Sequence, residues 1–173
     1  SSYPAVSPRV LYPGFSTMMR PGEILGLEWN RVDFERRVVR LGVKDTKGKQ
    51  RRIVPVNDAA FAALVRLKKV CNEYFPETTW VFTHTKPRYF GERIQDVRKV
   101  FQTAVKRAGM DHATPHCLRH TSITEGVHAP DANVVDISRV AGHRNLRTTL
   151  RYVHTADDRL HQAVAGLPTI GTL

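Results

Sequence analysis

The sequence predicts an α+β fold that is mostly α-helical and carries one small antiparallel sheet of three strands. Short runs rich in β-branched residues, separated by turn residues, cluster between residues 29 and 56. After residue 57, apolar side chains recur three and four positions apart in several longer segments, which is the spacing of one helix face. The chain has 173 residues, of which 41% are hydrophobic, so it can form one folded core.

The first 17 residues are expected to form a linker with little regular structure, because three prolines and a glycine interrupt them. A short helix is expected to follow. Pro21 suits its first turn, and Glu23 suits the positive end of its dipole. Arg20 then lies at the mouth of the helix, where its guanidinium can reach an anion. On this stretch alone, a surface arginine paired with Glu23 is the favoured interpretation.

The three strands are expected at residues 29–34, 37–43 and 51–56, with a turn at 45–50 that joins the last two. The stretch from Glu35 to Arg52 is strongly basic, with eight basic residues against two acidic ones, Glu35 and Asp45. The basic residues are Arg36, Arg37, Arg40, Lys44, Lys47, Lys49, Arg51 and Arg52. Charges on a sheet edge can simply prevent aggregation, but this excess favours contact with phosphates.

Two long helices are expected at residues 58–73 and 92–108. The first is capped by Asn57 or Asp58, since both side chains accept hydrogen bonds from a first helical turn. The apolar residues expected on its buried face are Phe61, Leu64, Val65 and Leu67. The second helix carries one apolar stripe and is closed by Gly109.

Two more helices follow. One begins at Thr114-Pro115, a cap residue followed by proline at the first helical position. The other spans residues 131–141, with its valines and isoleucine directed inward. The segment after it is polar and basic, and Leu146 and Leu150 are expected to anchor it to the core.

The net charge of the chain is +11, from 27 Lys and Arg against 16 Asp and Glu, and the sequence pI is about 10.2. This charge indicates a polyanionic partner, and nucleic acid is favoured over an anionic membrane. The alternative is a basic surface that only contacts solvent. No signal peptide or apolar run of transmembrane length is found, so we expect a soluble cytoplasmic protein. Cys71 and Cys117 show no metal or redox spacing, which fits a reducing compartment.

Three side chains that a hydrophobic core does not require share one face of the helix beginning at Pro115. His116, Arg119 and His120 are three to four positions apart and form a donor-rich site for an anion. A neutral imidazole is favoured at a helix N-terminus, so we interpret His116 as a proton acceptor. His120 is interpreted as a buried structural histidine. A metal held by His116 and His120 is disfavoured, because Arg119 between them would repel it.

His143 follows Gly142 at the end of the predicted 131–141 helix, and Tyr152 comes nine positions later. The glycine fixes the turn and leaves the imidazole free to point into a cleft. Tyr152 could be a core aromatic residue, but the basic neighbours Arg151 and His154 favour an exposed or cleft position. The stretch from His116 to Tyr152 thus combines an anion site with a phenol.

Five motifs occur in order along the chain. They are Arg-x-x-Glu at a helix start, a basic hairpin with T-K-G-K, H-x-L-R-H, G-H, and a tyrosine nine positions after that histidine. This set resembles the catalytic domain of the tyrosine recombinases, the phage-integrase family, from Met18 to about Gln162. The resemblance implies a tyrosine-recombinase catalytic-domain fold for residues 18–165, with 166–173 as a tail. The family's N-terminal core-binding domain is expected to have no counterpart here.

The resemblance implies six catalytic residues. They are Arg20, Lys47, His116, Arg119, His143 and Tyr152. Arg20 and Arg119 would bind the scissile phosphate, and Tyr152 would attack its phosphorus. Lys47 would protonate the leaving oxygen. Lys49 stays open as an alternative to Lys47, because the hairpin reads K-G-K-Q-R-R where the family often has K-T-G-K. The segment before Arg20 also departs from the family, since it is short and broken by proline.

The implied reaction cuts and rejoins DNA through a 3′-phosphotyrosyl link and releases a 5′-hydroxyl. A free phenol has a pKa of about 10, so a base or a positive pocket must supply about 4 kcal/mol at pH 7. The link conserves the bond energy, so neither ATP nor a metal nor any other cofactor is expected.

The expected partner is double-stranded DNA. The chain would be a monomer without DNA and would assemble as a tetramer on it. An amphipathic helix expected at 157–164 would dock on a neighbouring copy. Further contacts to phosphates are expected from Arg36, Arg40, Lys44, Lys49, Arg51, Arg144, Arg147 and Arg151. Such a protein would lie on the bacterial nucleoid.

Two other functions stay open at this point. A type IB topoisomerase-like relaxase would use the same chemistry without a partner protomer. A non-catalytic remnant of a mobile element would bind DNA in a salt-sensitive way and form no covalent adduct.

Overall fold

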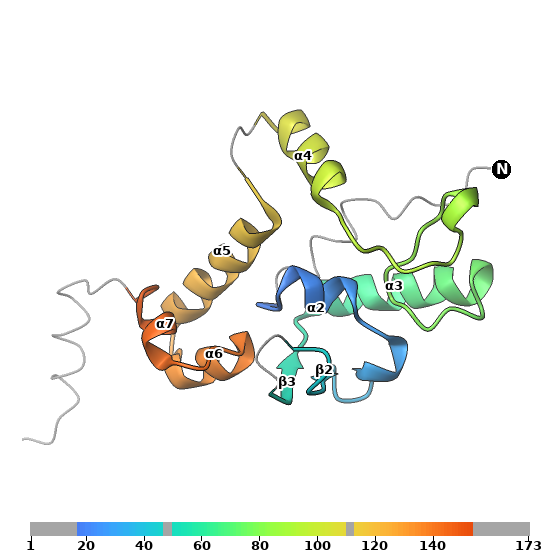
Figure 1. Ribbon diagram of the computed structural model, residues 1–173. Coiled ribbons are helices and arrows are strands. Elements are labelled where there is room, and N and C mark those ends of the chain that lie inside the picture. Colours follow the sequence, from blue (N-terminus) through green and yellow to red (C-terminus); the bar gives the residue numbers. More distant parts are fainter. Residues whose placement is uncertain (1–16, 47–49, 110–112, 154–173) are drawn as a thin grey trace, which may run out of the picture.

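The structure, a computed structural model, describes residues 17–46, 50–109 and 113–153 (Figure 1). The predicted fold class is confirmed, since helices predominate and the one sheet has three antiparallel strands. The expected linker, apart from its last residue, and the expected helix at 157–164 lie outside the described residues. In chain order the elements are α2 (Pro21–Leu25), the 3-10 helix η1 (Trp29–Arg31), β1 (Val32–Asp33), β2 (Val38–Leu41), β3 (Arg52–Pro55), α3 (Asp58–Tyr74), the 3-10 helix η2 (Pro87–Tyr89), α4 (Arg98–Arg107), α5 (Pro115–His128), α6 (Val134–Ala141) and α7 (Leu146–Leu150).

The sheet has the order β1-β2-β3, and its inner face is apolar. Val39 of β2 pairs with Val54 of β3, and both side chains are almost completely buried. The predicted first strand at 29–34 was wrong in its first half, where η1 replaces it. The reason is tertiary, because the backbone N–H of Trp29 donates to the carbonyl of Thr79 instead of to a neighbouring strand.

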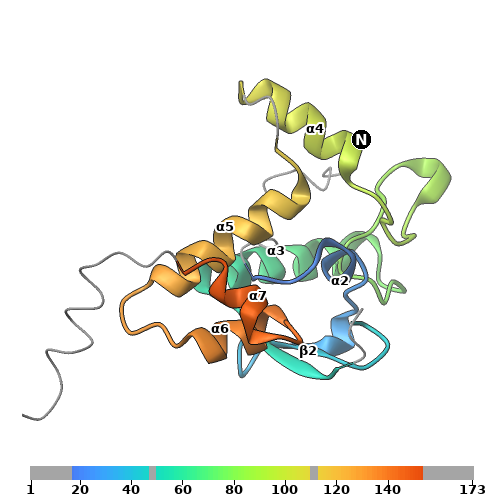
Figure 2. The same cartoon turned by 60° about the vertical axis from the view of Figure 1, so that its left-hand side comes forward.

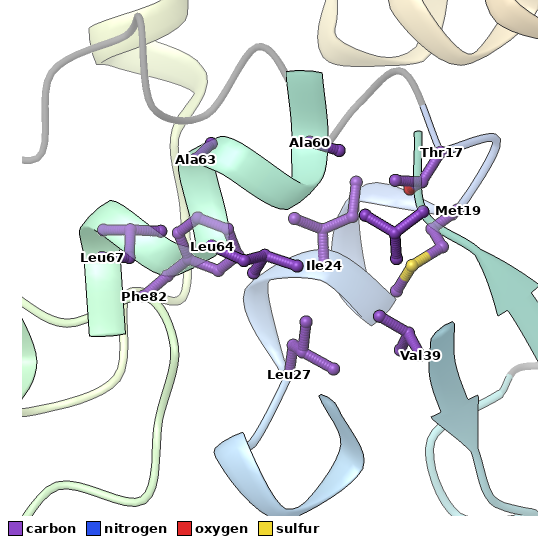
Figure 3. A pocket seen from close by; sticks show the side chains of 11 residues that line it. Thr17, Met19, Ile24, Leu27, Val39, Ala60, Ala63, Leu64, Leu67 and Phe82 are labelled. Atoms are coloured by element: carbon purple, nitrogen blue, oxygen red, sulfur yellow. The ribbon is translucent and has the colours of Figure 1, made fainter. Parts of the chain in front are cut away.

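The larger core cluster lies between α2, the sheet and α3. Ile24 of α2 and Val39 of β2 point into it from one side, and Leu64 and Leu67 of α3 from the other (Figure 3). Helix α3 begins as predicted, with the Asn57 side chain accepting a hydrogen bond from the backbone of its first turn.

One residue of the predicted face of α3 was placed wrongly. Val65 is 46% exposed, because it lies about 100° around the helix from the buried Leu64. The stripe that contacts the core is formed by Ala60, Ala63, Leu64, Leu67 and Cys71.

The second core cluster joins α5 to α6 through Ile123, Val127 and Ala141. Helix α5 begins after the predicted Thr114 cap. Helix α6 ends at Ala141 as predicted, but its predicted start at residue 131 was wrong, because the Asn133 side chain caps the first turn and the helix begins at Val134. Figures 1 and 2 show α5, α6 and α7 gathered on one side of the molecule.

The predicted anchors of α7 were wrong, since Leu146 and Leu150 are 40% and 47% exposed. Thr149 is the buried residue instead, because its hydroxyl meets the ring of His143 in the interior. Among the inward residues predicted for α6, Val135 is also exposed.

Helix α4 is shorter than the predicted 92–108 segment. The residues before it are extended, because the backbone N–H of Ile94 donates to Phe82 and that of His84 to Glu92. Gly109 follows the helix with a φ of 70°, as its predicted role requires. No helix within the described ranges is long and apolar enough to span a membrane.

Candidate active site

Arg119 is the central charged group of the site and is only 7% exposed. From α5 its guanidinium donates to the carbonyls of Met18 and Ala141, the latter at 2.8 Å, and it lies 3.2 Å from Nε2 of His143. Burial, and secondly the charge of Arg20, lower the pKa of Arg119 to about 10. The group therefore stays cationic at neutral pH.

Arg20 reaches the same point from the start of α2. One nitrogen donates to the carbonyl of Gly142 at 3.0 Å, and another lies 3.1 Å from the Glu23 carboxylate. The ion pair with Glu23 that the sequence favoured is present, and the contact with the end of α6 exists beside it. Helices α2 and α5 thus bring Arg20 and Arg119 onto two consecutive carbonyls.

Glu23 and Arg52 support the site, although neither is among the six catalytic residues that the family resemblance implies. Glu23 is 5% exposed and accepts hydrogen bonds from Arg52 at 2.5 and 3.1 Å. Arg52 also donates from Nε to the carbonyl of Val140 at 3.0 Å, so it joins β3 to the end of α6. Burial alone would raise the pKa of Glu23, but hydrogen bonds from Arg52 and Arg20 lower it overall.

A signal for Glu23 and Arg52 was present in the sequence. Glu23 belongs to the Arg-x-x-Glu motif, and Arg52 opens the strand that follows the basic hairpin. Neither pattern shows that one buried carboxylate is shared by two arginines, because that sharing depends on how the elements pack.

His143 follows Gly142, which adopts the left-handed conformation that ends α6. Its Nδ1 lies 2.8 Å from the Thr149 hydroxyl, and its Nε2 faces Arg119. Burial, and secondly the charge of Arg119, lower the pKa of His143 to about 4, so the ring is neutral at pH 7. Since a guanidinium only donates, Nε2 accepts and Nδ1–H donates to Thr149.

Tyr152 contacts two histidine rings. Its Oη lies 2.5 Å from Nδ1 of His120, and the two ring centroids are 5.5 Å apart. The ring of His143 stacks on it at 6.3 Å. The prediction of a buried His120 was wrong, because His120 lies one position after the buried Arg119 and so turns to the exposed edge of α5.

His116 occupies the first turn of α5 and is exposed. It lines an open groove between α2, α4 and α5, together with Pro21 and Gly22. Over the described ranges it forms no hydrogen bond or ion pair, and it is not brought against Tyr152.

A basic pocket of about 160 Å³ opens beside these groups. The residues that line it are Arg20, Thr46, Gln50, Arg51, Arg52, Arg139, Gly142 and His143. None of these described lining residues is acidic. The Thr46 hydroxyl bonds to the backbone of Gln50 at 3.0 Å, so both ends of the hairpin reach the pocket. Lys47 and Lys49 themselves lie outside the described residues.

The basic residues predicted to contact phosphates fall into two groups. Arg40, Lys44 and Arg51 line a broad groove along the sheet, while Arg36 is exposed in the turn between β1 and β2. The three arginines of the second group are exposed at and around α7, and they are Arg144, Arg147 and Arg151. Arg40 is ion-paired with Asp33.

A metal site is not formed by the described residues, since no three of their His, Cys, Asp and Glu side chains gather closely enough to hold an ion. His116 and His120, the pair considered from the sequence, lie in different surroundings.

Solved structures resemble this fold. The crystal structure of XerA recombinase matches with a TM-score of 0.70 at 24% identity, covering 90% of this chain and 56% of that one. The Tn1549 transposon integrase in complex with a circular intermediate DNA matches at 0.74 and 23%, covering 92% and 58%. The catalytic domain of bacteriophage HP1 integrase matches at 0.61 and 23%, covering 94% and 84%.

Sequence relatives point the same way. Tyrosine recombinase XerC of Corynebacterium glutamicum is 33% identical over 154 residues, covering 86% of this chain and 46% of the relative. The integrase of Salmonella phage P22 is 28% identical over 166 residues, covering 90% and 41%. The chain thus spans somewhat less than half the length of these curated relatives. The model of the phage integrase family matches residues 12–159. The chain belongs to the phage integrase family, the tyrosine recombinases.

Proposed function

We propose that residues 18–165 are the catalytic domain of a site-specific DNA recombinase, or integrase. The domain cuts DNA by forming a covalent link between Tyr152 and a 3′-phosphate, and rejoins it by the reverse step. The observation that carries this proposal comes from a member of the phage integrase family. Arg20 and His143 line one basic pocket, and Arg119 and Tyr152 both contact His143 beside it.

Double-stranded DNA is the proposed substrate. The net charge of +11 and a pocket lined by four arginines favour a polyanion. The Tn1549 integrase, and XerH recombinase with its difH site, are both similar in fold and were solved with DNA. The exposed arginines around α7 and along the sheet would hold the backbone on either side of the pocket.

The arginines would stabilise the phosphate as negative charge grows on its non-bridging oxygens. A guanidinium has five N–H donors in a planar fork. The contacts of Arg119 with Met18, Ala141 and His143 leave part of this fork for an anion. Losing one such donor typically costs about 3–4 kcal/mol of transition-state stabilisation.

The leaving 5′-oxygen needs a proton, which we assign to Lys47, with Lys49 as the alternative. Both lysines belong to the hairpin whose two ends line the pocket. His116 sits beside Pro21 on the Arg20 side, and this position supports contact with bound DNA rather than with the phenol. The family is metal-independent, and we expect neither metal nor ATP to be needed.

Exchange between two duplexes requires four strand cuts, and each protomer has one Tyr152. We therefore propose a tetramer on DNA and a monomer in its absence. In a mobile element or a chromosome, the protein would act at the nucleoid.

The test uses a pool of nicked DNA duplexes with random sequence around the nick, because the target sequence is not known. Cleavage near the nick releases a short fragment, so the strand cannot be rejoined and the covalent adduct accumulates. Wild-type protein in EDTA is expected to give a protein–DNA band that Tyr152→Phe lacks. No adduct from the whole pool would refute the recombinase function. Relaxation of any supercoiled plasmid would instead favour a topoisomerase, and salt-sensitive binding without an adduct would favour a non-catalytic remnant.

A further inference from the structure

The phenol of Tyr152 is in contact with an imidazole that is not one of the six residues implied by the family motifs. We propose that His120 is a catalytic residue that takes the proton from Tyr152 as the phenol attacks DNA. This inference rests on the proposed recombinase function and adds the general base to it.

The geometry supplies the first argument. Nδ1 of His120 lies 2.5 Å from Oη of Tyr152, which is the distance of a strong hydrogen bond to the reacting atom. The two rings also lie 5.5 Å apart with an angle of 29° between their planes, so the phenol is held in place. His120 is exposed, so its far nitrogen can exchange protons with solvent.

The second argument is that the other candidate bases are engaged elsewhere. His143 stacks on Tyr152, but its Nε2 accepts from Arg119 and its Nδ1 is bound to Thr149. Its pKa of about 4 also makes it a weak base. Both oxygens of Glu23 are held by arginines. Among the described residues, His120 is therefore the titratable base with a nitrogen on the phenol.

The third argument is the arrangement of the H-x-L-R-H motif on α5. Arg119 points inward to the carbonyls at the end of α6, while the next residue, His120, turns outward to Tyr152. Consecutive residues of one helix thus place a fixed positive charge and a proton acceptor around one phenol. The charge of Arg119 favours the phenolate that forms.

The O–H bond of Tyr152 breaks, and its proton goes to Nδ1 of His120. The Oη lone pair forms the bond to phosphorus, the bond from phosphorus to the 5′-oxygen breaks, and that oxygen takes a proton from the hairpin lysine. In the reverse step, a 5′-hydroxyl gives its proton to the hairpin lysine as its oxygen bonds to phosphorus. The bond from phosphorus to Oη breaks, and the His120 imidazolium returns its proton to the departing Tyr152 phenolate.

The decisive variant is His120→Asn, because the amide oxygen can accept the hydrogen bond near the position of Nδ1 but cannot take the proton. We expect single-turnover adduct formation on captured nicked duplexes to fall at least about 100-fold, with DNA binding within about twofold of wild type. His84→Asn, which changes a half-buried histidine remote from Tyr152, should keep the wild-type rate. A wild-type or faster rate for His120→Asn overturns the proposal.

A second substrate distinguishes a general-base role of His120 from a general-acid role. Replacing the leaving 5′-oxygen by sulfur removes the need for a proton on the leaving group. This substrate should restore adduct formation by Lys47→Ala or Lys49→Ala, whichever lysine is the acid, and should not restore His120→Asn. If this substrate restored adduct formation by His120→Asn, His120 would act on the leaving group, and its role as base would be overturned.

A measurement without DNA tests the hydrogen bond itself. Nitrogen NMR of the histidine side chains should show His120 with an unprotonated Nδ1 at neutral pH, and Tyr152→Phe should shift that resonance. A protonated Nδ1 in neutral His120 would overturn the proposal, since it could only donate. No capture of DNA by wild-type protein refutes the recombinase function, whereas capture with unimpaired His120→Asn refutes the base alone.

Discussion

Gly142 is the single position where the charged groups of the site crowd most closely. Its φ of 67° is left-handed, its carbonyl accepts from Arg20, and the Arg52 guanidinium lies against its Cα. A Cβ built at this position would lie 2.8 Å from the guanidinium carbon of Arg52. The residue therefore needs to be glycine for both backbone and packing reasons.

Gly142→Ala is expected to lower the free energy of unfolding by about 1–3 kcal/mol, because a left-handed alanine is strained and Arg52 must move. Urea denaturation followed by circular dichroism measures the change. Gly22→Ala is the control, since no atom lies within 4 Å of its added Cβ and helical alanine is favourable. Equal stability of the Gly142 variant and wild type would contradict this account.

His143 makes stability depend on pH. Burial and the nearby arginines lower its pKa from 6.5 to about 4, so between these values the unfolded chain binds a proton that the folded one does not. The contribution of His143 to stability is therefore complete above pH 6.5 and is lost as the pH falls toward 4. Allowing for partial exposure, the loss is on the order of 1–2 kcal/mol.

The measurement is urea unfolding of wild type and His143→Gln at a series of pH values. The difference in stability between the two proteins should shrink as the pH falls from 6.5 to 4. A constant difference over that range would mean that the imidazole is not held neutral.

At the scale of elements, Glu23 of α2 binds Arg52 of β3 and also Arg20, the residue that caps its own helix. Glu23→Gln removes the one negative charge between Arg20 and Arg52 and leaves two buried or half-buried cations facing each other. We expect a loss of about 3–5 kcal/mol, the usual cost of removing one partner from a buried ion pair. Thermal and urea unfolding measure it. Glu77→Gln, at an exposed position, should be neutral, and a similar value for both variants would contradict the shared-carboxylate interpretation.

Helix boundaries that depend on local caps could be predicted from the sequence, and those set by distant partners could not. Asn57 and Thr114 begin their helices as expected, because cap chemistry acts within one turn. The start of α4 was predicted six residues too early, because residues 92–94 pair with 82–84 across space. Apolar periodicity also misplaced the anchor of α7, where the polar Thr149 is buried by its bond to His143.

For the candidate site, the sequence could suggest residues but could not show which groups they contact. The motifs pointed to Arg20, Arg119, His143 and Tyr152, which the structure brings together. The role of His120 was missed because two histidines flank Arg119 in one motif, and only the phase of α5 decides which of them faces Tyr152.

At the scale of the whole molecule, positive charge covers the sheet groove and the surroundings of α7. If these surfaces hold DNA, log Kobs should fall linearly with log salt concentration, with a slope of about −0.9 for each phosphate neutralised. Arg51→Ala should make the slope shallower by about 0.9, since Arg51 lines both the pocket and the sheet groove. Fluorescence anisotropy with labelled duplex measures this.

Arg66→Ala is the matched control for the salt experiment. It removes an exposed arginine from α3 that lines neither surface, so its slope should equal that of wild type. Identical slopes for the Arg51 and Arg66 variants would mean that the charge of the pocket does not contact the DNA backbone.

The division of the interior into two core clusters also determines which part of the molecule the tryptophan fluorescence reports on. The chain has two tryptophans, Trp29 and Trp80. Trp29 packs on the larger cluster, and Trp80 forms a β-bridge with Glu28, next to Trp29. In the part of the chain that the structure describes, the second cluster has one tyrosine, Tyr152, and no tryptophan, and tyrosine is a much weaker emitter. If α5, α6 and α7 alone lost their packing, the side chains around Tyr152 would move apart. The tryptophan emission spectrum would nevertheless stay almost unchanged.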